Sequence, residues 1–194
     1  MLIKVYGAAV QGIDAYIVTI EASTSRGIRF FLVGLPDSAV KESHERIVSA
    51  FHVNGYKFPS SQIIINMAPA DIRKEGAAYD LPLAIVIMAS VGDISAELLD
   101  DYVIMGEMGL DGSLQPVKGA LSMAIKARAE GFKGIILPFQ NAPEAAVIDN
   151  LEVYGAHNLR EVVDLLNQRN GHIVPVENIS GFDCKDQFCQ GFDF

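Results

Sequence analysis

Arg73, Lys74 and Lys118 are the residues best suited by type and position to chemistry with a charged partner. Arg73 and Lys74 are adjacent in a loop that continues into Glu75 and Gly76, and Lys118 begins a segment with a helical pattern. Basic side chains attract phosphate groups and acidic surfaces, so these three are candidate contacts to DNA or to a neighbouring subunit. Cations on loops and helices are more commonly solvated surface, and this alternative stays open for all three.

The histidines and cysteines do not have the spacing of a metal site. Structural zinc sites use four ligands, usually at short and regular intervals. Cys184 and Cys189 are an isolated pair near the end of the chain, so we expect no metal site there. We also expect no metal ligand among the four histidines, which are His44, His52, His157 and His172.

The composition indicates a globular domain with an acidic surface. The chain has 194 residues, of which 50% are hydrophobic and 20% are charged, and its net charge is −9. That charge argues against a generally basic surface for nucleic acid, although a local basic patch is compatible with it. No apolar run reaches the roughly 18 residues of a membrane span. Two cysteines give no disulfide framework, so we expect a protein of the reducing cytoplasm, with no membrane partner.

The first third of the chain predicts strands followed by one helix. Residues 1–16 have the pattern of a strand rather than of a signal peptide. Residues 13–21 and 28–35 also predict strands, which we expect to form a hairpin or meander. A helix follows with Asp37 or Ser38 as its N-cap, and it ends at Asn54-Gly55.

The middle of the chain predicts a buried strand, a buried helix and a hairpin. Residues 62–69 form a short continuous apolar run, as expected of a strand buried on both faces. Asp80 is the expected cap of a helix over 81–91 that is apolar all round and therefore buried. Asp111-Gly112 is a two-residue hairpin signal between apolar segments, and residues 118–130 predict an amphipathic helix.

The last third predicts two further strands and two helices. Residues 134–138 and 151–156 are the strands, with a short helix over 142–149 between them, and Asn158 caps a final amphipathic helix. The resulting order of elements predicts a two-layer α/β fold with a mixed sheet. Beyond residue 170 no periodic pattern is sustained. We therefore expect one domain over 1–170 and a linker over 171–194.

Four long stretches carry a resemblance to a known family. They are 31-FLVGLPDSAVKESHERIVSAF-51, 65-INMAPADIRKEGAAYDLPLAI-85, 74-KEGAAYDLP-82 and 106-GEMGLDGSLQPVKGALSMAIKARAEGFKGIILP-138. Together they resemble the N-terminal domain of the ComM/YifB proteins, which are magnesium-chelatase-like AAA+ ATPases. The resemblance implies the fold of the Lon peptidase domain and of ribosomal protein S5 domain 2.

The last two stretches resemble the segments that hold the catalytic serine and lysine of the Lon peptidase domain. Carried over residue by residue, the serine position falls on Ala78 and the lysine position on Leu121. A Ser–Lys dyad needs a hydroxyl to attack and an amine to accept its proton, and neither side chain has one. The resemblance therefore implies vestigial dyad positions and no catalytic residue. We expect Leu121 to lie in an apolar setting, and Lys118 to lie near Arg73 and Lys74.

The resemblance also implies what surrounds this domain. In the family an AAA+ module follows it, and that module binds ATP and Mg. The present chain has no G-x-x-x-x-G-K-(S/T) phosphate loop, so we expect no cofactor here. The implied parent is a hexameric DNA motor for branch migration in recombination or natural transformation, with this domain contacting its own ATPase module and neighbouring subunits. A protein-interaction domain without a DNA role and a hydrolase with a relocated centre are the alternatives.

Overall fold

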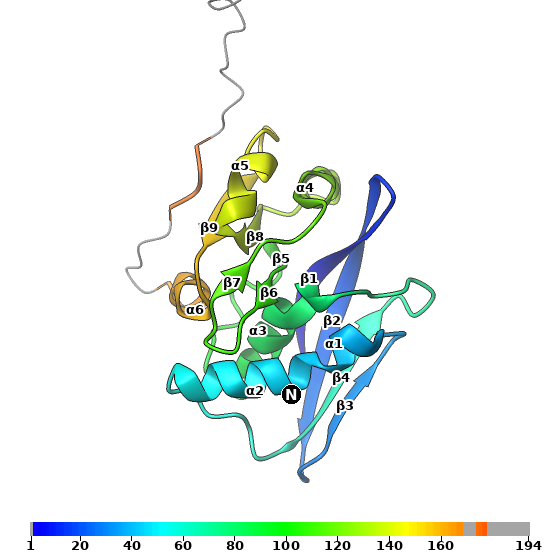
Figure 1. Cartoon of the computed structure of the whole chain (residues 1–194), viewed down its shortest axis with the longest axis vertical. Coiled ribbons are helices and arrows are strands. Elements are labelled where there is room, and N and C mark those ends of the chain that lie inside the picture. The colour runs from blue at the N-terminus through cyan, green and yellow to red at the C-terminus, as the bar shows by residue number, and fades with distance from the viewer. Residues whose placement is uncertain (1, 169–173, 178–194) are drawn as a thin grey trace, which may run out of the picture.

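The computed structural model describes residues 2–168 and 174–177. Within these residues the main sheet has seven strands in the order β3-β4-β2-β1-β5-β8-β9, and two short strands form a separate hairpin (Figure 1). The strands of the main sheet are β1 (Leu2–Gln11), β2 (Asp14–Ser25), β3 (Phe30–Val33), β4 (Gln62–Ala68), β5 (Tyr102–Ile104), β8 (Gly134–Pro138) and β9 (Glu152–Ala156). The hairpin strands are β6 (Glu107–Met108) and β7 (Leu114–Gln115).

Helices pack against this sheet, which is the expected mixed α/β architecture. The α-helices are α1 (Ser38–Lys41), α2 (Ser43–Val53), α3 (Asp80–Ser90), α4 (Ala120–Ala129), α5 (Ala142–Ala145) and α6 (Leu159–Leu166). Two short 3-10 helices precede α3 and α5, and they are η1 (Ala77–Tyr79) and η2 (Phe139–Asn141). Among the described residues no helix is long and apolar enough to cross a membrane.

The first two strands form a long antiparallel hairpin, with partners running from Leu2 and Ser23 to Gln11 and Asp14. The expected pairing of residues 13–21 with residues 28–35 is wrong. β4 lies between β2 and β3, antiparallel to β2 and parallel to β3. After β3 the chain passes through α1 and α2 and then re-enters the sheet as β4, which takes the place beside β2.

The core is built around α3, whose side chains are all buried, as its uniform apolar sequence predicts. α3 packs against β1, β2 and α2, so it is enclosed between the sheet and a second helix (Figure 1). β4 differs from the expected strand buried on both faces. Ile63, Ile65 and Met67 are buried, but Ile64, whose side chain is on the opposite face, is 39% exposed.

Local sequence signals set several element ends as predicted. The carboxylate of Asp37 accepts a hydrogen bond from the N–H of Val40 at 2.8 Å and caps α1. The side chain of Asn158 caps α6 through the N–H of Glu161 at 3.1 Å. Gly55, with φ +78, supplies the left-handed stop after α2.

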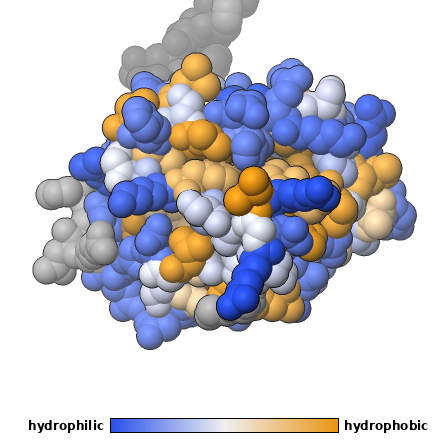
Figure 2. Space-filling view, turned by 90° about the horizontal axis from the view of Figure 1, so that it is seen from below, coloured by the Kyte–Doolittle hydropathy of each residue, from blue (hydrophilic) through white to orange (hydrophobic). Residues whose placement is uncertain are grey.

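The edges of the sheet differ in what covers them. At the β9 edge, the N–H of Val176 donates to the carbonyl of Val153 at 2.8 Å, so residues 174–177 run beside that strand. At the other edge β3 pairs only with β4, and Phe31 and Val33 are partly exposed. Figure 2 shows hydrophobic residues interspersed with hydrophilic ones on the face viewed from below, rather than gathered in one continuous apolar area. Apart from residues 174–177, the predicted linker over 171–194 lies outside the described part of the chain.

Candidate vestigial cleft

A cleft of about 570 Å³ lies where the end of β1 meets the loop before α3 and the hairpin segment before α4. Arg73 and Ala78 line this cleft from the loop before α3, and Lys118 lines it from the distant segment before α4. The cations share it with Glu75 and Glu107, so the charges around the cleft are balanced. The other lining residues are Ala8, Ala9, Val10, Gln11, Gly12, Gly76, Ala77, Tyr79, Met105, Pro116, Val117 and Met123.

Ala78 is held by hydrogen bonds between its loop and the segment before β6. Its carbonyl accepts a hydrogen bond from the N–H of Gly106 at 2.9 Å, and the carbonyl of Gly106 accepts one from the N–H of Leu81 at 3.0 Å. Ala78, which the resemblance predicts to stand at the serine position, is therefore fixed and lines the cleft. Its methyl side chain cannot act as a nucleophile.

Leu121 does not line the cleft, and the expectation that it lies in an apolar setting is wrong. It is in the first turn of α4 with 37% of its surface exposed, and its N–H donates to the carboxylate of Glu144 at 3.1 Å. Ser122, the neighbouring hydroxyl, donates to the carbonyl of Ile13 at 2.7 Å. From α4 and the segment before it, the apolar side chains of Val117 and Met123 face the cleft instead.

Lys74 is fully buried, so the expectation that it forms a basic surface spot with Arg73 is wrong. Its ammonium donates to the carbonyls of Gly34, at 2.8 Å, and Pro69. Burial lowers the pKa of this ammonium, because the surrounding protein solvates the charge less well than water does. Lys74 thus joins stretches 31–51 and 65–85, a structural role that the sequence pattern did not reveal.

Arg73, next to Lys74, points the other way. Its side chain is 65% exposed and its Nε lies 3.0 Å from a carboxylate oxygen of Glu75. Lys118 is also exposed. Of the three predicted contact residues, Arg73 and Lys118 are therefore accessible to a partner.

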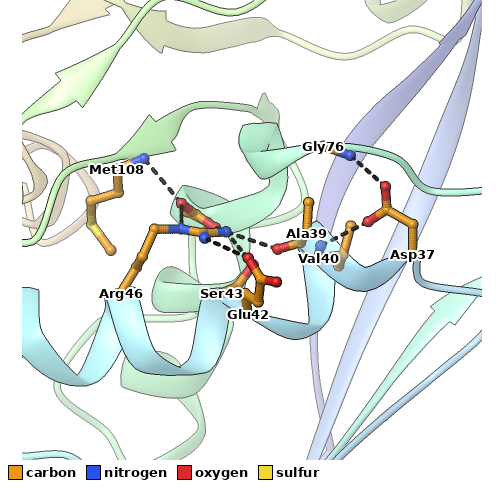
Figure 3. Close-up of polar contacts among 9 residues, drawn as sticks. Asp37, Ala39, Val40, Glu42, Ser43, Arg46, Gly76 and Met108 are labelled. Atoms are coloured by element: carbon orange, nitrogen blue, oxygen red, sulfur yellow. Dashed lines mark hydrogen bonds and ion pairs between the residues drawn. The ribbon is translucent and has the colours of Figure 1, made fainter.

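Asp37 also connects stretches 31–51 and 65–85. One carboxylate oxygen caps α1 through Val40, and the other accepts the N–H of Gly76 at 3.1 Å (Figure 3). The N–H of Asp37 in turn donates to the carbonyl of Lys74 at 3.0 Å. The loop that leads to Ala78 is thus tied to the N-terminus of α1.

Asp80 was expected to cap α3, and that expectation is wrong. Its carboxylate is fully buried and is bound by two nitrogens of Arg46, Nε at 2.7 Å and Nη2 at 2.9 Å. The N–H of Met108 also donates to this carboxylate, at 3.2 Å, and Arg46 further donates to the carbonyl of Ala39 at 2.8 Å (Figure 3). The hydrogen bond with Asp80 raises the pKa of Arg46.

Arg46 is a residue that sequence reasoning missed, because the helical pattern placed it away from the apolar face of α2. The buried ion pair joins α2, the start of α3 and β6 beside the cleft. An acidic residue at the entrance to an entirely apolar helix was the one available signal, since a buried carboxylate requires a partner.

Two of the described histidines, His44 and His157, pack against aromatic rings, and His52 is exposed. The ring of His44 lies 4.7 Å from that of Phe30, and the ring of His157 stacks 4.3 Å from that of Phe139. Across residues 2–168 and 174–177, no group of three or more His, Cys, Asp or Glu side chains is placed to hold a metal ion. Cys184 and Cys189 lie outside these residues.

The seven-stranded mixed sheet with its packed helices is an α/β domain of the Lon-peptidase type. The family described as subunit ChlI of Mg-chelatase matches residues 20–141, which are more than half of the chain. The chain therefore belongs to the Mg-chelatase subunit ChlI family, and its relatives place it with the ComM/YifB-type members.

Two of these relatives match most of the chain. The chain is 38% identical to the protein YifB of Salmonella typhimurium over 167 residues, which are 86% of this chain and 33% of that protein. It is 40% identical to competence protein ComM of Haemophilus influenzae over 164 residues, which are 84% of this chain and 32% of that protein. The chain thus spans about a third of the length of these relatives.

A more distant relative bears on the fold. The chain is 26% identical to Lon protease 2 of Thermus thermophilus over an alignment of 166 residues, which covers 79% of this chain and 20% of that protein. This likeness agrees with the Lon-like fold expected from the sequence.

Proposed function

We propose that this chain is the non-catalytic accessory domain of a ComM-type AAA+ ATPase. In this proposal the domain occupies the Lon-peptidase frame without its chemistry, and a separate module of the same protein binds ATP and Mg. The observation that carries the proposal is Ala78, a methyl side chain that is held in the cleft where the resemblance predicts a nucleophile. The short span of the match, about a third of each relative, is consistent with a further module.

The parent protein, in the same proposal, is a hexameric motor that acts on DNA during recombination or natural transformation. The Haemophilus influenzae relative is named a competence protein, which supports a role in natural transformation. Arg73 and Lys118 are the proposed contacts of this domain with DNA or with a neighbouring subunit. The nearby carboxylates of Glu75 and Glu107 oppose strong attraction of a polyanion. We therefore assign the main DNA affinity to the motor.

Two experiments test the non-catalytic assignment. A fluorophosphonate probe, which labels activated serines, is expected to leave the chain unmodified, and labelling would revive the relocated-hydrolase alternative. The continuation of the gene is expected to encode a phosphate-binding loop of the form G-x-x-x-x-G-K-(S/T). A gene without that motif would remove the motor from the proposal.

A further inference from the structure

Three exposed cations lie at the end of the sheet that is far from the cleft. β2 starts beside the cleft residue Gly12 and runs over 12 residues to Ser25 at the opposite end. Arg26 and Arg29 follow this strand, and Lys57 lies in the loop before β4. Within the described residues, none of these three cations forms an ion pair.

The sequence around these cations contains no acidic residue. Residues 22–31 and 52–62 include two arginines and one lysine but no aspartate or glutamate, although the whole chain has a net charge of −9. At the cleft, by contrast, Arg73 is paired with Glu75, and Glu107 lines the same cavity. An anion is therefore attracted to the far end of the sheet more strongly than to the cleft.

A hollow of about 420 Å³ lies at this end, between the turn after β2 and the start of β4. Figure 1 shows these two segments side by side at the lower end of the sheet, and Figure 2 views this end from below. None of the described residues that line the hollow is acidic or has an apolar side chain. The lining of this hydroxyl pocket consists of Thr24, Ser25, Arg26, Gly27, Ser60 and Ser61.

The hydrogen-bond donors of the hydroxyl pocket are unused. Within the described part of the chain, the guanidinium of Arg26 and the hydroxyls of Thr24, Ser25, Ser60 and Ser61 have no partner in the protein. A hydroxyl can donate one hydrogen bond and a guanidinium five. Donors of this kind around a positive charge complement the oxygens of a phosphate group, which accept hydrogen bonds and carry negative charge.

Strand pairing holds the two sides of the pocket in place. Ser25 is paired with Gln62 in the ladder between β2 and β4, and the N–H of Ile63 donates to the carbonyl of Arg29 at 2.9 Å. Gly27 has φ +136, and a Cβ atom there would lie 3.1 Å from the Cβ of Gln62. The turn that carries the guanidinium therefore packs closely against the start of β4, so the donors from the two segments are arranged before any ligand arrives.

We propose that the hydroxyl pocket binds a phosphate group, with the guanidinium of Arg26 as the charged contact and the four hydroxyls as further donors. Arg29 and Lys57 lie outside the pocket at the same end of the sheet, and they add attraction for a phosphate that belongs to a longer polyanion. Two sources supply this chemistry, a free phosphate ion and the backbone of a nucleic acid strand, and the experiment below separates them. The inference does not depend on the non-catalytic accessory role or on the motor proposed above.

The test is a titration of the whole 194-residue chain with sodium phosphate, with sodium chloride at equal ionic strength as the reference. Binding is followed by NMR at the backbone N–H groups of residues 24–27 and 60–61. Arg26→Gln removes the charge, and Ser60→Ala with Ser61→Ala removes two of the hydroxyls. The matched control is Arg128→Gln, which removes the charge of an exposed arginine on α4 outside the pocket.

We expect phosphate to produce saturable shifts at residues 24–27 and 60–61 of the wild type. Arg26→Gln should weaken binding at least about tenfold, because the charged donor is lost. The double serine variant should weaken it at least about threefold, whereas Arg128→Gln should bind as the wild type does. Shifts confined to other residues, or equal binding by Arg26→Gln, would overturn the proposal.

A second titration, with a single-stranded oligonucleotide that has no terminal phosphate, separates the two sources. Binding that weakens as salt rises, and that is reduced by Arg26→Gln and further by Arg29→Gln with Lys57→Gln, would identify the nucleic acid backbone as the source. Response to phosphate without response to the oligonucleotide would identify the free ion. No shift at the pocket with either probe would contradict the proposal, and a parent ATPase that does not respond to DNA would leave all of these outcomes unaffected.

Discussion

The guanidinium of Arg46 binds the buried carboxylate of Asp80 through Nε at 2.7 Å and Nη2 at 2.9 Å, across 34 positions of sequence. Asp80 lies directly after η1, the turn that contains Ala78, and it also accepts the N–H of Met108 at the start of the hairpin. One ion pair therefore fixes the two segments that border the cleft relative to α2. The carboxylate of Asp80 is fully buried, so its negative charge is stabilised by these hydrogen-bond donors rather than by water.

Removing the arginine is expected to destabilise the fold strongly. Arg46→Ala leaves an unpaired buried carboxylate, and we expect a loss of about 3–5 kcal/mol in the free energy of unfolding, measured with urea. The matched control is Arg73→Ala, because Arg73 pairs with Glu75 on the surface with both side chains more than half exposed. That control should cost no more than about 1 kcal/mol. Similar losses for the two variants would refute the structural role of Arg46.

Gly34 should not tolerate a side chain. It has φ +100, and a Cβ atom would lie 2.0 Å from the carbonyl oxygen of Met67, because Gly34 directly follows β3 and Met67 lies in the neighbouring strand β4. Gly55 is the control, since it also has a positive φ but no atom within 4 Å of an added Cβ. Gly55→Ala should cost about 1–2 kcal/mol from backbone strain alone, and Gly34→Ala distinctly more. Thermal unfolding with equal shifts for both variants would contradict the close approach.

The pH dependence of stability should report the burial of Tyr79. Burial raises the pKa of its hydroxyl, with the carboxylates of Asp37 and Glu75 adding to the effect. The unfolded phenol ionises near pH 10 while the folded one stays protonated, so its contribution to stability is present below pH 10 and is lost as the pH rises further. Between pH 8 and pH 11 the wild type should lose about 1.4 kcal/mol more than Tyr79→Phe does. Equal losses in urea unfolding would show that this hydroxyl is not shielded.

Restoring the two dyad residues should not restore peptidase activity. Catalytic groups must be held within about 0.5 Å of a productive geometry. A serine at Ala78 would face the cleft, whereas a lysine at Leu121 would begin from a partly exposed position outside the cleft lining. The variant Ala78→Ser with Leu121→Lys is therefore expected to cleave casein no faster than the wild type. Cleavage above that background would show that α4 can deliver the lysine.

The elements set by local sequence were predictable. The uniform apolar run of α3 predicted a buried helix. Asp111-Gly112 predicted a hairpin, which β6 and β7 form, but its loop covers residues 109–113 rather than two residues. Asp37 and Asn158 were predictable as caps, because a short polar side chain before a helical pattern satisfies the first free N–H groups.

Features that depend on contacts between distant segments were not predictable. The insertion of β4 between β2 and β3 depends on strand pairing that no local pattern encodes. Lys74 and Arg73 are adjacent cations with the same apparent character, yet one is buried against Gly34 and the other faces solvent. The two side chains differ in burial because the carbonyls that accept from Lys74 belong to two separate loops, which the local sequence does not bring together.

The burial of Lys74 also decides how the proposed basic contact must be tested. A charge reversal at Lys74 would place an unpaired carboxylate in the core and confound any effect on DNA. Arg73 and Lys118 are the exposed cations at the cleft, so they are the residues to reverse. The isolated chain, with its net charge of −9, should bind DNA only in the non-specific range of roughly 10⁻⁴ to 10⁻⁶ M at physiological salt.

The most direct test of the accessory role is ATP hydrolysis by the full-length protein with and without branched DNA. We predict stimulation of the wild type by DNA, and a larger loss of the stimulated rate than of the basal rate in the Arg73→Glu, Lys118→Glu double variant. The control is Lys41→Glu with Arg128→Glu, which reverses two exposed cations outside the cleft lining and should leave both rates near those of the wild type. A wild-type rate that does not respond to branched DNA would contradict the proposed role of this domain in a DNA-dependent ATPase.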